Sequence, residues 1–284
     1  MRIFTFLLFL FLFGTTSIAS NKDTLSIVTW NIYMRPRFIM HNNQVERARE
    51  IVNAVQNDSM DIIVFEEIFD KKARRIISHG LKSIYKYTAG PGKMGFFRLN
   101  CGVMIFSKYK VASSKVVFYN DCKSADCLAK KAVIYTEIQI KENKKFNLLG
   151  THLQAIEGNV YRKVRERQLN KMQKLSEKNK QENVPTVFAG DFNITERDSL
   201  FQNLLSIFKV KQLPVISKRK FSSDNDNTYK QGDTGGSLID HIFLNENQTG
   251  AVLENMEVIR KEYSKNGKNY DLSDHYLVKA KLIY

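Results

Sequence analysis

Apolar residues recur along this chain with two different periods, and each period predicts a different element. Short runs rich in β-branched and aromatic side chains are typical of buried strands. These runs cover Leu25–Thr29, Ile62–Phe65, Val103–Phe106, Val116–Tyr119, Val133–Ile140, Phe146–Thr151, a stretch that begins at Thr186, Leu238–Leu244 and Leu277–Ile283. Between them, apolar residues at helical spacing predict helices around 45–55, 73–81, 161–178 and 200–208. Because no repeat or linker-like break interrupts the series, the pattern predicts one layered α/β domain.

Polar residues at the ends of these runs are the exceptions to the apolar pattern. The stretch that begins at Thr186 ends in Gly190-Asp191-Phe192-Asn193, and the alternate positions put Asp191 and Asn193 on one side of a strand end. Other strand boundaries carry an acid, an amide or an imidazole: Asn31, Glu67, His152, Asp240, and Asp274 with His275. Taken singly, such residues are usually turns or caps. Six boundaries together favour one convergent site.

The residue types at these boundaries suit hydrolysis of a phosphate ester with a bound metal. Oxygen atoms such as those of Glu67 and an amide are hard ligands that Mg²⁺ prefers, and the Cys/His spacing of a zinc site is absent. Histidine exchanges protons near neutral pH, and Asp240 is a candidate to orient His275. No side chain stands out as a covalent nucleophile, so we expect attack by an activated water.

The first twenty residues differ from the rest and predict a secretory signal peptide. Arg2, the apolar run Ile3–Phe13 and small residues up to Ala19 follow one another in the order of an export signal. The apolar run is short for a membrane span, and an uncleaved anchor is the alternative. We therefore expect cleavage near Ala19, a secreted protein, and a single domain over 21–284.

Composition and charge narrow the class of partner. A hydrophobic content of 43% allows a packed core and argues against disorder. A net charge of +15 favours phosphodiesters, nucleic acid or acidic membrane surfaces, with solubility alone as the alternative. Three cysteines in an exported chain predict one disulfide and one free thiol. Cys122 and Cys127 could close a small loop, but the spacing leaves the pairing with Cys101 open.

Five motifs, in their order along the chain, resemble the endonuclease/exonuclease/phosphatase family. They are Thr29-Trp30-Asn31, Glu66-Glu67-Ile68-Phe69-Asp70, Gly150-Thr151-His152-Leu153-Gln154-Ala155, Gly190-Asp191-Phe192-Asn193 and Ser273-Asp274-His275. Within the family, Asn31-Ile32-Tyr33-Met34 and the Thr151–Ala155 stretch are most similar to the secreted bacterial sphingomyelinases C. The resemblance runs from about Trp30 to the end of the chain.

The resemblance implies a fold and a role for each site residue. The fold would be α/β (α+β), a four-layer α/β/β/α sandwich in which helices flank two mostly antiparallel sheets. Glu67 would be the main Mg²⁺ ligand, with Asn31 nearby and Asp274 supporting the metal; Mn²⁺ or Co²⁺ could replace Mg²⁺. Asp191 and Asn193 would position the water and the phosphate. His275, backed by Asp240, would be the general base and His152 the general acid, while Glu66 competes with Glu67 as the metal ligand.

The function implied by the resemblance is Mg²⁺-dependent hydrolysis of sphingomyelin to ceramide and phosphocholine. Its partners would be a sphingomyelin-containing membrane surface with anionic or zwitterionic phosphodiester head groups, and the protein would be a monomer. A secreted deoxyribonuclease-like nuclease, with nucleic acid as the partner, is the alternative. A third hypothesis is a non-catalytic, membrane-binding or toxin-like descendant of the family.

Two departures from the family pattern concern the membrane and the disulfide. Family members often carry an aromatic hairpin just before the Ser-Asp-His motif, whereas 260–270 contains lysines around Asn266-Gly267 and neither Trp nor Phe. This argues against deep membrane insertion there. Phe96-Phe97 would be a substitute contact, or else a half-buried loop anchor. The family's cysteine after the Thr-His-Leu-Gln motif is also missing, because 155–161 contains no Cys.

Overall fold

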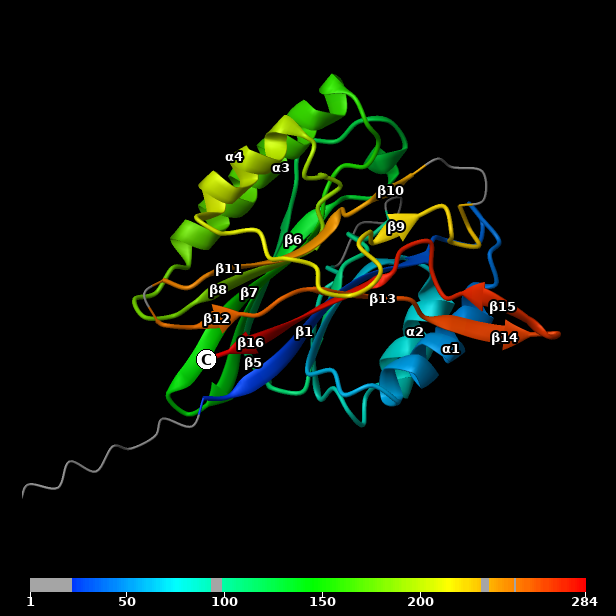
Figure 1. Cartoon of the computed structure of the whole chain (residues 1–284), viewed down its shortest axis with the longest axis horizontal. Coiled ribbons are helices and arrows are strands. Elements are labelled where there is room, and N and C mark those ends of the chain that lie inside the picture. Colours follow the sequence, from blue (N-terminus) through cyan, green and yellow to red (C-terminus); the bar gives the residue numbers. More distant parts are fainter. Residues whose placement is uncertain (1–21, 93–98, 231–234, 248) are drawn as a thin grey trace, which may run out of the picture.

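Two β-sheets packed face to face form the centre of the structure, a computed structural model that describes residues 22–92, 99–230, 235–247 and 249–284 (Figure 1). The first sheet has the order β12-β16-β1-β2-β4-β3, with β13 also paired to β16. Its strands are β1 (Thr24–Met34), β2 (Ile62–Ile68), β3 (Tyr87–Ala89), β4 (Met104–Ser107), β12 (Val252–Leu253), β13 (Glu257–Ile259) and β16 (Leu277–Ile283). The second sheet has the order β11-β8-β7-β6-β5. Its strands are β5 (Lys110–Phe118), β6 (Ala132–Lys141), β7 (Lys144–His152), β8 (Thr186–Asp191) and β11 (Asp240–Asn245).

Only one pair of neighbouring strands in each large sheet is parallel, namely β1–β2 and β7–β8. The other described pairs in these sheets are antiparallel. Helices α1 (Gln44–Gln56) and α2 (Lys71–Gly80) cover the first sheet, and α3 (Asn159–Lys178) and α4 (Ser199–Phe208) cover the second (Figure 1). The predicted four-layer α/β/β/α sandwich with mostly antiparallel sheets is therefore confirmed.

The central strands read as continuous apolar runs because both of their faces are buried. Ile27 packs between the two sheets, whereas its neighbour Val28 points to the helices α1 and α2. In the same way Leu148 lies between the sheets and Leu149 lies under α3 and α4. The apolar positions of each helix meet the outer face of one sheet, which gives three core clusters rather than one.

Side-chain caps fix where two of the helices begin. The carboxylate of Asp70 accepts hydrogen bonds from the backbone N–H groups of Lys72 and Ala73, at 3.1 and 2.8 Å, at the start of α2. Asp198 accepts from the N–H of Leu200 at 2.9 Å at the start of α4. Each cap satisfies donors that a helix leaves unpaired in its first turn.

Several strands are longer than the apolar runs that predicted them. β5 begins at Lys110, earlier than the predicted Val116, because it is an edge strand with mostly exposed side chains. β3 was not predicted, for the same reason. β1 continues to Met34 and β2 to Ile68, since their polar residues are also buried.

Smaller elements surround one end of the sandwich. They are the 3₁₀ helix η1 (Ser124–Leu128), the pair β9 (Ser223–Asp224) with β10 (Gly236–Ser237), and the hairpin β14 (Glu262–Lys265) with β15 (Lys268–Asp271). Asn266 and Gly267 both have positive φ, so the predicted tight turn of this hairpin is confirmed. The hairpin lies beside α1, where Lys265 pairs with Glu46 at 2.6 Å (Figure 1).

One disulfide joins Cys122 to Cys127, and Cys101 is a buried free thiol. The predicted count of one disulfide and one thiol is therefore confirmed, and the structure supplies the pairing. None of the described helices is long and apolar enough to cross a membrane. The predicted signal peptide and the Phe96-Phe97 pair lie outside the described residues.

Candidate active site

The ends of four strands bring the predicted site residues together at one end of the sandwich. In the β7–β8 pair His152 lies opposite Asp191, and in the β8–β11 pair Asp240 lies opposite the same Asp191. Asn31 comes from β1 in the facing sheet, and its amide Nδ2 donates to Asp191 Oδ2 at 3.1 Å. His275 comes from the turn before β16. The two sheets thus contribute to one site.

Asp191 is the residue around which the others gather. Besides Asn31, its Oδ2 lies 3.4 Å from His152 Nε2 and 4.0 Å from His275 Nε2. Its Oδ1 accepts the backbone N–H of Asn193 at 3.0 Å. Burial, and then the negative charge of Asp240, raise the pKa of Asp191. The site therefore holds a carboxylate that gains from any positive charge brought close to it.

The strand before Asp191 requires a glycine. Gly190 has a φ of 152°, and a Cβ placed there would lie 2.0 Å from the carbonyl oxygen of Thr151 on the neighbouring strand β7. Only glycine allows this approach. The close contact sets His152 and Asp191 side by side, which is why the Gly-Asp motif matters beyond its turn preference.

His275 is held by the second carboxylate, Asp240. Its Nδ1 donates to Asp240 Oδ2 at 2.8 Å, and both side chains are buried. Burial alone would lower the pKa of His275, but the charge and hydrogen bond of Asp240 and the charge of Asp191 outweigh it and raise that pKa. Ser273 anchors this turn to the first sheet, because its hydroxyl donates to the carbonyl of Asn31 at 2.6 Å.

His152 has the opposite electrostatic environment. Burial, followed by the charges of Lys131 and His275, lowers the pKa of His152 well below its ordinary value. Its Nδ1 has no hydrogen-bond partner among the described residues. Lys131 is itself buried, and its ammonium bonds to the carbonyl of Leu153 and lies 3.0 Å from Asp126. These surroundings therefore disfavour a proton on His152.

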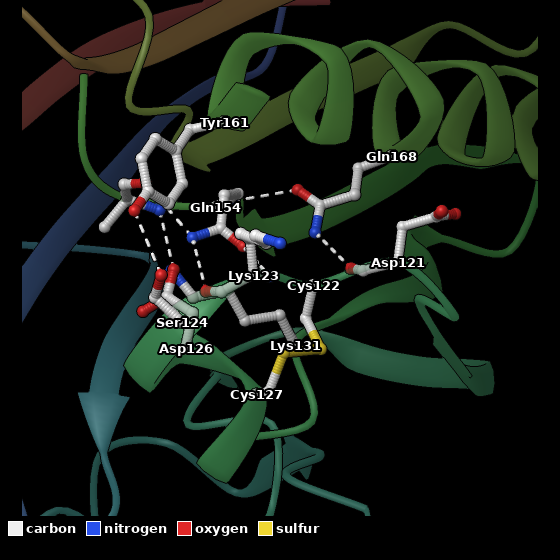
Figure 2. Close-up of a disulfide and its surroundings, with 11 residues drawn as sticks. Asp121, Cys122, Lys123, Ser124, Asp126, Cys127, Lys131, Gln154, Tyr161 and Gln168 are labelled. Atoms are coloured by element: carbon white, nitrogen blue, oxygen red, sulfur yellow. Dashed lines mark hydrogen bonds and ion pairs between the residues drawn. A yellow bond between two sulfur atoms is a disulfide. The ribbon is translucent and has the colours of Figure 1, made fainter. Parts of the chain in front are cut away.

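The disulfide loop packs against the segment that follows His152 (Figure 2). The side chain of Gln154 accepts from the N–H of Lys123 at 2.9 Å and donates to its carbonyl at 3.2 Å. Asp126 accepts the N–H of Ala155 at 2.7 Å. These bonds join the loop closed by Cys122 and Cys127 to the Thr-His-Leu-Gln-Ala motif. The sequence predicts that Cys122 and Cys127 could close a small loop, but nothing in the spacing of 122–127 points to residues 154 and 155.

The predicted metal ligands lie around Tyr33 and Arg35. Glu67 adopts a left-handed backbone conformation with φ 53°, and its Oε2 is 3.2 Å from Arg35 Nε. Burial, and then the charges of Asp274 and Glu67, raise the pKa of Tyr33 against the opposing charge of Arg35, so both carboxylates are close to one phenol. Asn31 Oδ1 accepts the N–H of Tyr33 at 3.1 Å. This set of carboxylate and amide oxygens fits a hard divalent cation.

Glu66 points to a different environment from Glu67. Its side chain is fully buried, Thr29 donates to its Oε1 at 2.7 Å, and its Oε2 has no partner among the described residues. Burial, and then the charge of Asp240, raise the pKa of Glu66 well above its ordinary value. A carboxyl group enclosed in this way is a poorer metal ligand than the partly accessible Glu67 beside Arg35. The choice of Glu67 stays a prediction.

Three of the predicted catalytic residues also satisfy a simple geometric criterion for a metal site. One ligand atom each from Asp191, Asp240 and His275 lie within 4.8 Å of one another. The Nδ1 of His275 is at hydrogen-bond distance from Asp240, which favours a shared proton on that side of the ring. The divalent cation therefore fits better at the predicted ligands Glu67, Asn31 and Asp274 than between Asp240 and His275.

A cleft of about 910 Å³ opens next to these groups. Asn193 forms part of its wall, and its side chain donates to the carbonyl of Leu153 at 3.1 Å. Other described residues of the wall include Arg162, Arg197, Phe221 and Lys230. The cleft is large enough for a phosphate-bearing group, and its wall carries both basic side chains and the acids Glu157, Asp198 and Asp224.

The model of the Endonuclease/Exonuclease/phosphatase family matches residues 28–275 of this chain. The chain belongs to this family. It is 27% identical to a sphingomyelinase C from Leptospira interrogans, over 89% of this chain and 51% of that protein, and 28% identical to a sphingomyelinase C from Bacillus cereus, over 92% and 89%. This chain therefore spans about half the length of the Leptospira relative.

A solved structure shares the fold of this family member. A beta toxin variant from Staphylococcus aureus with bound magnesium ions superposes with a TM-score of 0.79 at 22% identity, covering 91% of this chain and 99% of that one. At this identity the likeness shows that the two chains share a fold.

Proposed function

We propose that this family member is an exported, Mg²⁺-dependent phosphodiesterase that hydrolyses sphingomyelin to ceramide and phosphocholine. The main support for this mechanism is the arrangement of two histidines around Asp191. Two buried histidines with opposite pKa shifts flank the carboxylate of Asp191 at the mouth of the sheets. Pairs of titratable groups with pKa values pushed apart are typical of acid–base catalysis. The substrate is proposed because the named relatives are sphingomyelinases C.

The metal would be held by Glu67 with Asp274 and Asn31. When bound, Mg²⁺ would neutralise negative charge on the phosphate oxygens, and Mn²⁺ or Co²⁺ are proposed substitutes. Arg35 pairs with Glu67 at 3.2 Å, and its side chain is 42% exposed. This pair supports the proposal, because the carboxylate of Glu67 already has a positive charge beside it.

The chain's own side chains would position the reactants and move protons. Asp191 and Asn193 would orient the water and the phosphate. His275, supported by Asp240, would take the proton of the water, and His152 would give a proton to the leaving alkoxide of ceramide. A general base has to be unprotonated, and the raised pKa of His275 by itself favours the reverse assignment. Positive charge held by Glu67 and Asp274 would oppose the proton on His275, and the negative charge of a bound phosphodiester would favour a proton on His152.

The test of this function is phosphocholine release from sphingomyelin vesicles, with Mg²⁺ or with a chelator. We expect release by the wild type with Mg²⁺, none with chelator, and a loss of about 10²- to 10⁴-fold in His275→Ala. His79→Ala, an exposed histidine near the end of α2, is the matched control and keeps full activity.

A plasmid-nicking assay under the same conditions separates the two candidate substrates. DNA cleavage without phosphocholine release would replace sphingomyelin with nucleic acid and keep the metal site. Release that survives both the chelator and His275→Ala would contradict the proposed mechanism. Absence of both activities would exclude both substrates.

A further inference from the structure

An exposed apolar turn lies next to the proposed metal ligands. Phe38 is 82% exposed and Ile39 is 47% exposed, in the segment between β1 and α1. The carbonyl of Pro36 accepts the backbone N–H groups of Ile39 and Met40, at 2.8 and 3.1 Å, so this turn has a defined backbone. The two large apolar side chains therefore point outward from a structured support. Most exposed apolar side chains need no explanation, but an adjacent pair beside an active site does.

Two arginines form the base of this turn. Arg35 Nε lies 3.2 Å from Glu67, and Arg37 Nε lies 3.0 Å from Asp70 at the start of α2. Each side chain is 42% exposed, and the outer guanidinium nitrogens of both make no hydrogen bond to the described residues. An apolar tip on a cationic base is the arrangement of an interfacial anchor, in which the apolar groups enter the acyl boundary and the cations meet phosphates.

Further exposed apolar side chains lie at the same end of the sandwich. Ile156 and Val160 follow β7, which delivers His152, and Leu128 lies in the disulfide loop before β6. β6 and β7 are antiparallel, with Val133 opposite Thr151, so the start of β6 and the end of β7 share one end. In the first sheet, the strand pairs place exposed Val252 and Tyr87 near the starts of β1 and β2, at the opposite end.

The β14–β15 hairpin has a different surface. Its turn is Asn266-Gly267, and Lys265 pairs with Glu46 of α1. Lys261, just before the hairpin, pairs with Asp58 after α1 at 2.5 Å. Two of its basic side chains are thus held by acids of this chain rather than left for a partner. Tyr270 on β15 is 38% exposed, but the turn Asn266-Gly267 itself carries no apolar side chain like those of Phe38 and Ile39.

We propose that the turn 35–39 is the segment with which this protein enters a phospholipid surface, by the side chains of Phe38 and Ile39 with Arg35 and Arg37 on phosphate groups. The choice of a lipid partner rests on the proposed function. A protein partner is disfavoured because one turn with two apolar side chains offers far less than the roughly 800 Å² per partner of a stable interface. Insertion at this place would set the site at the membrane surface, next to the head groups.

The test compares Phe38→Ser/Ile39→Ser with a matched pair, Tyr87→Ser/Val252→Ser, at the opposite end. Sedimentation with sphingomyelin–phosphatidylcholine vesicles in chelator measures binding without turnover. We expect the first variant to bind about tenfold to a hundredfold more weakly than the wild type, and the matched pair to bind like the wild type. Hydrolysis of vesicles relative to a water-soluble phosphocholine ester should fall by a similar factor. Equal binding of all three proteins, or no binding by the wild type, would overturn the proposal.

Phe38→Trp gives a second readout that does not remove the apolar side chain. Trp30, the one natural tryptophan, is buried in the core. We expect vesicles to shift the emission of the variant to shorter wavelength and leave the wild type unchanged; an unshifted emission would contradict insertion at this position. Because binding is measured without turnover, the two proposals fail separately. If Phe38→Ser/Ile39→Ser binds vesicles weakly but the wild type releases no phosphocholine, only the proposed substrate is wrong. If the wild type releases phosphocholine and the variant binds like the wild type, only the proposed anchor is wrong.

Discussion

His275 and His152 contact the same oxygen of Asp191, yet their surroundings shift their pKa values in opposite directions. Behind His275 stands the carboxylate of Asp240, which outweighs the cost of burial and favours the proton. Near His152 stands the ammonium of Lys131, which adds to the cost of burial and disfavours it. Both imidazoles are buried, so burial does not distinguish them. The charge of the neighbouring side chain, Asp240 or Lys131, sets the direction in which each pKa moves.

The largest expected effect follows from removing the charge behind His275. Asp240→Asn keeps the shape but loses the negative charge that raises the pKa of His275, so this pKa falls. We expect kcat to drop by about 10²- to 10⁴-fold, because the ring also loses its orienting partner. If His275 is the base, it becomes unprotonated at lower pH, and the acidic limb of the kcat/KM–pH profile moves to lower pH.

The same profile tests the assignment of roles. A shift of the basic limb to lower pH in Asp240→Asn, with the acidic limb in place, would mean that His275 is the acid and His152 the base. Comparison of profiles measured with Mg²⁺ then shows which proton order holds in the loaded enzyme.

A smaller effect is expected from removing the cation near His152. Lys131→Met takes away a charge that lowers the pKa of His152, so this pKa rises toward its ordinary value. If His152 is the acid, the basic limb of the profile moves to higher pH, and kcat falls about tenfold because Asp126 and Leu153 lose their shared partner. An NMR titration of His152 checks the direction. Lys131→Arg should restore most of the profile; an unmoved His152 pKa in Lys131→Met would contradict this account.

The smallest effect concerns the disulfide loop that holds the segment after His152 (Figure 2). Cys122→Ser/Cys127→Ser should lower the unfolding free energy by about 2 kcal/mol, since the closed loop is short. We expect kcat to fall by roughly threefold with little change in KM, because the loop touches the His152 segment and not the cleft. Dithiothreitol should bring the wild type to the same level and leave the double variant unchanged. A double variant with wild-type kcat would limit the loop to a role in stability.

Burial explains both the strands that the sequence predicted and those that it missed. β3 and the first part of β5, before Val116, escaped the apolar pattern because edge strands expose their side chains, whereas the central strands with two buried faces were found. Glu66 was seen only as a competitor of Glu67. Its enclosure beside Asp240 depends on how the first sheet packs on the second, which no local pattern encodes. Lys131 and Arg35 were missed as neighbours of the site because isolated basic residues are common in a chain with a net charge of +15.

The order of residues was enough to predict most of the elements, the family resemblance and the polar residues at strand ends. It could do so because burial imposes periodic apolar residues and because a phosphodiester site needs acids, amides and imidazoles. The folded structure adds which of those groups face each other and that Lys131 lies near His152. It also shows that Phe38 and Ile39 are exposed in the turn that begins at Arg35, the partner of Glu67. These facts depend on contacts between segments far apart in the chain, and electrostatic and packing energies arise only once those contacts form.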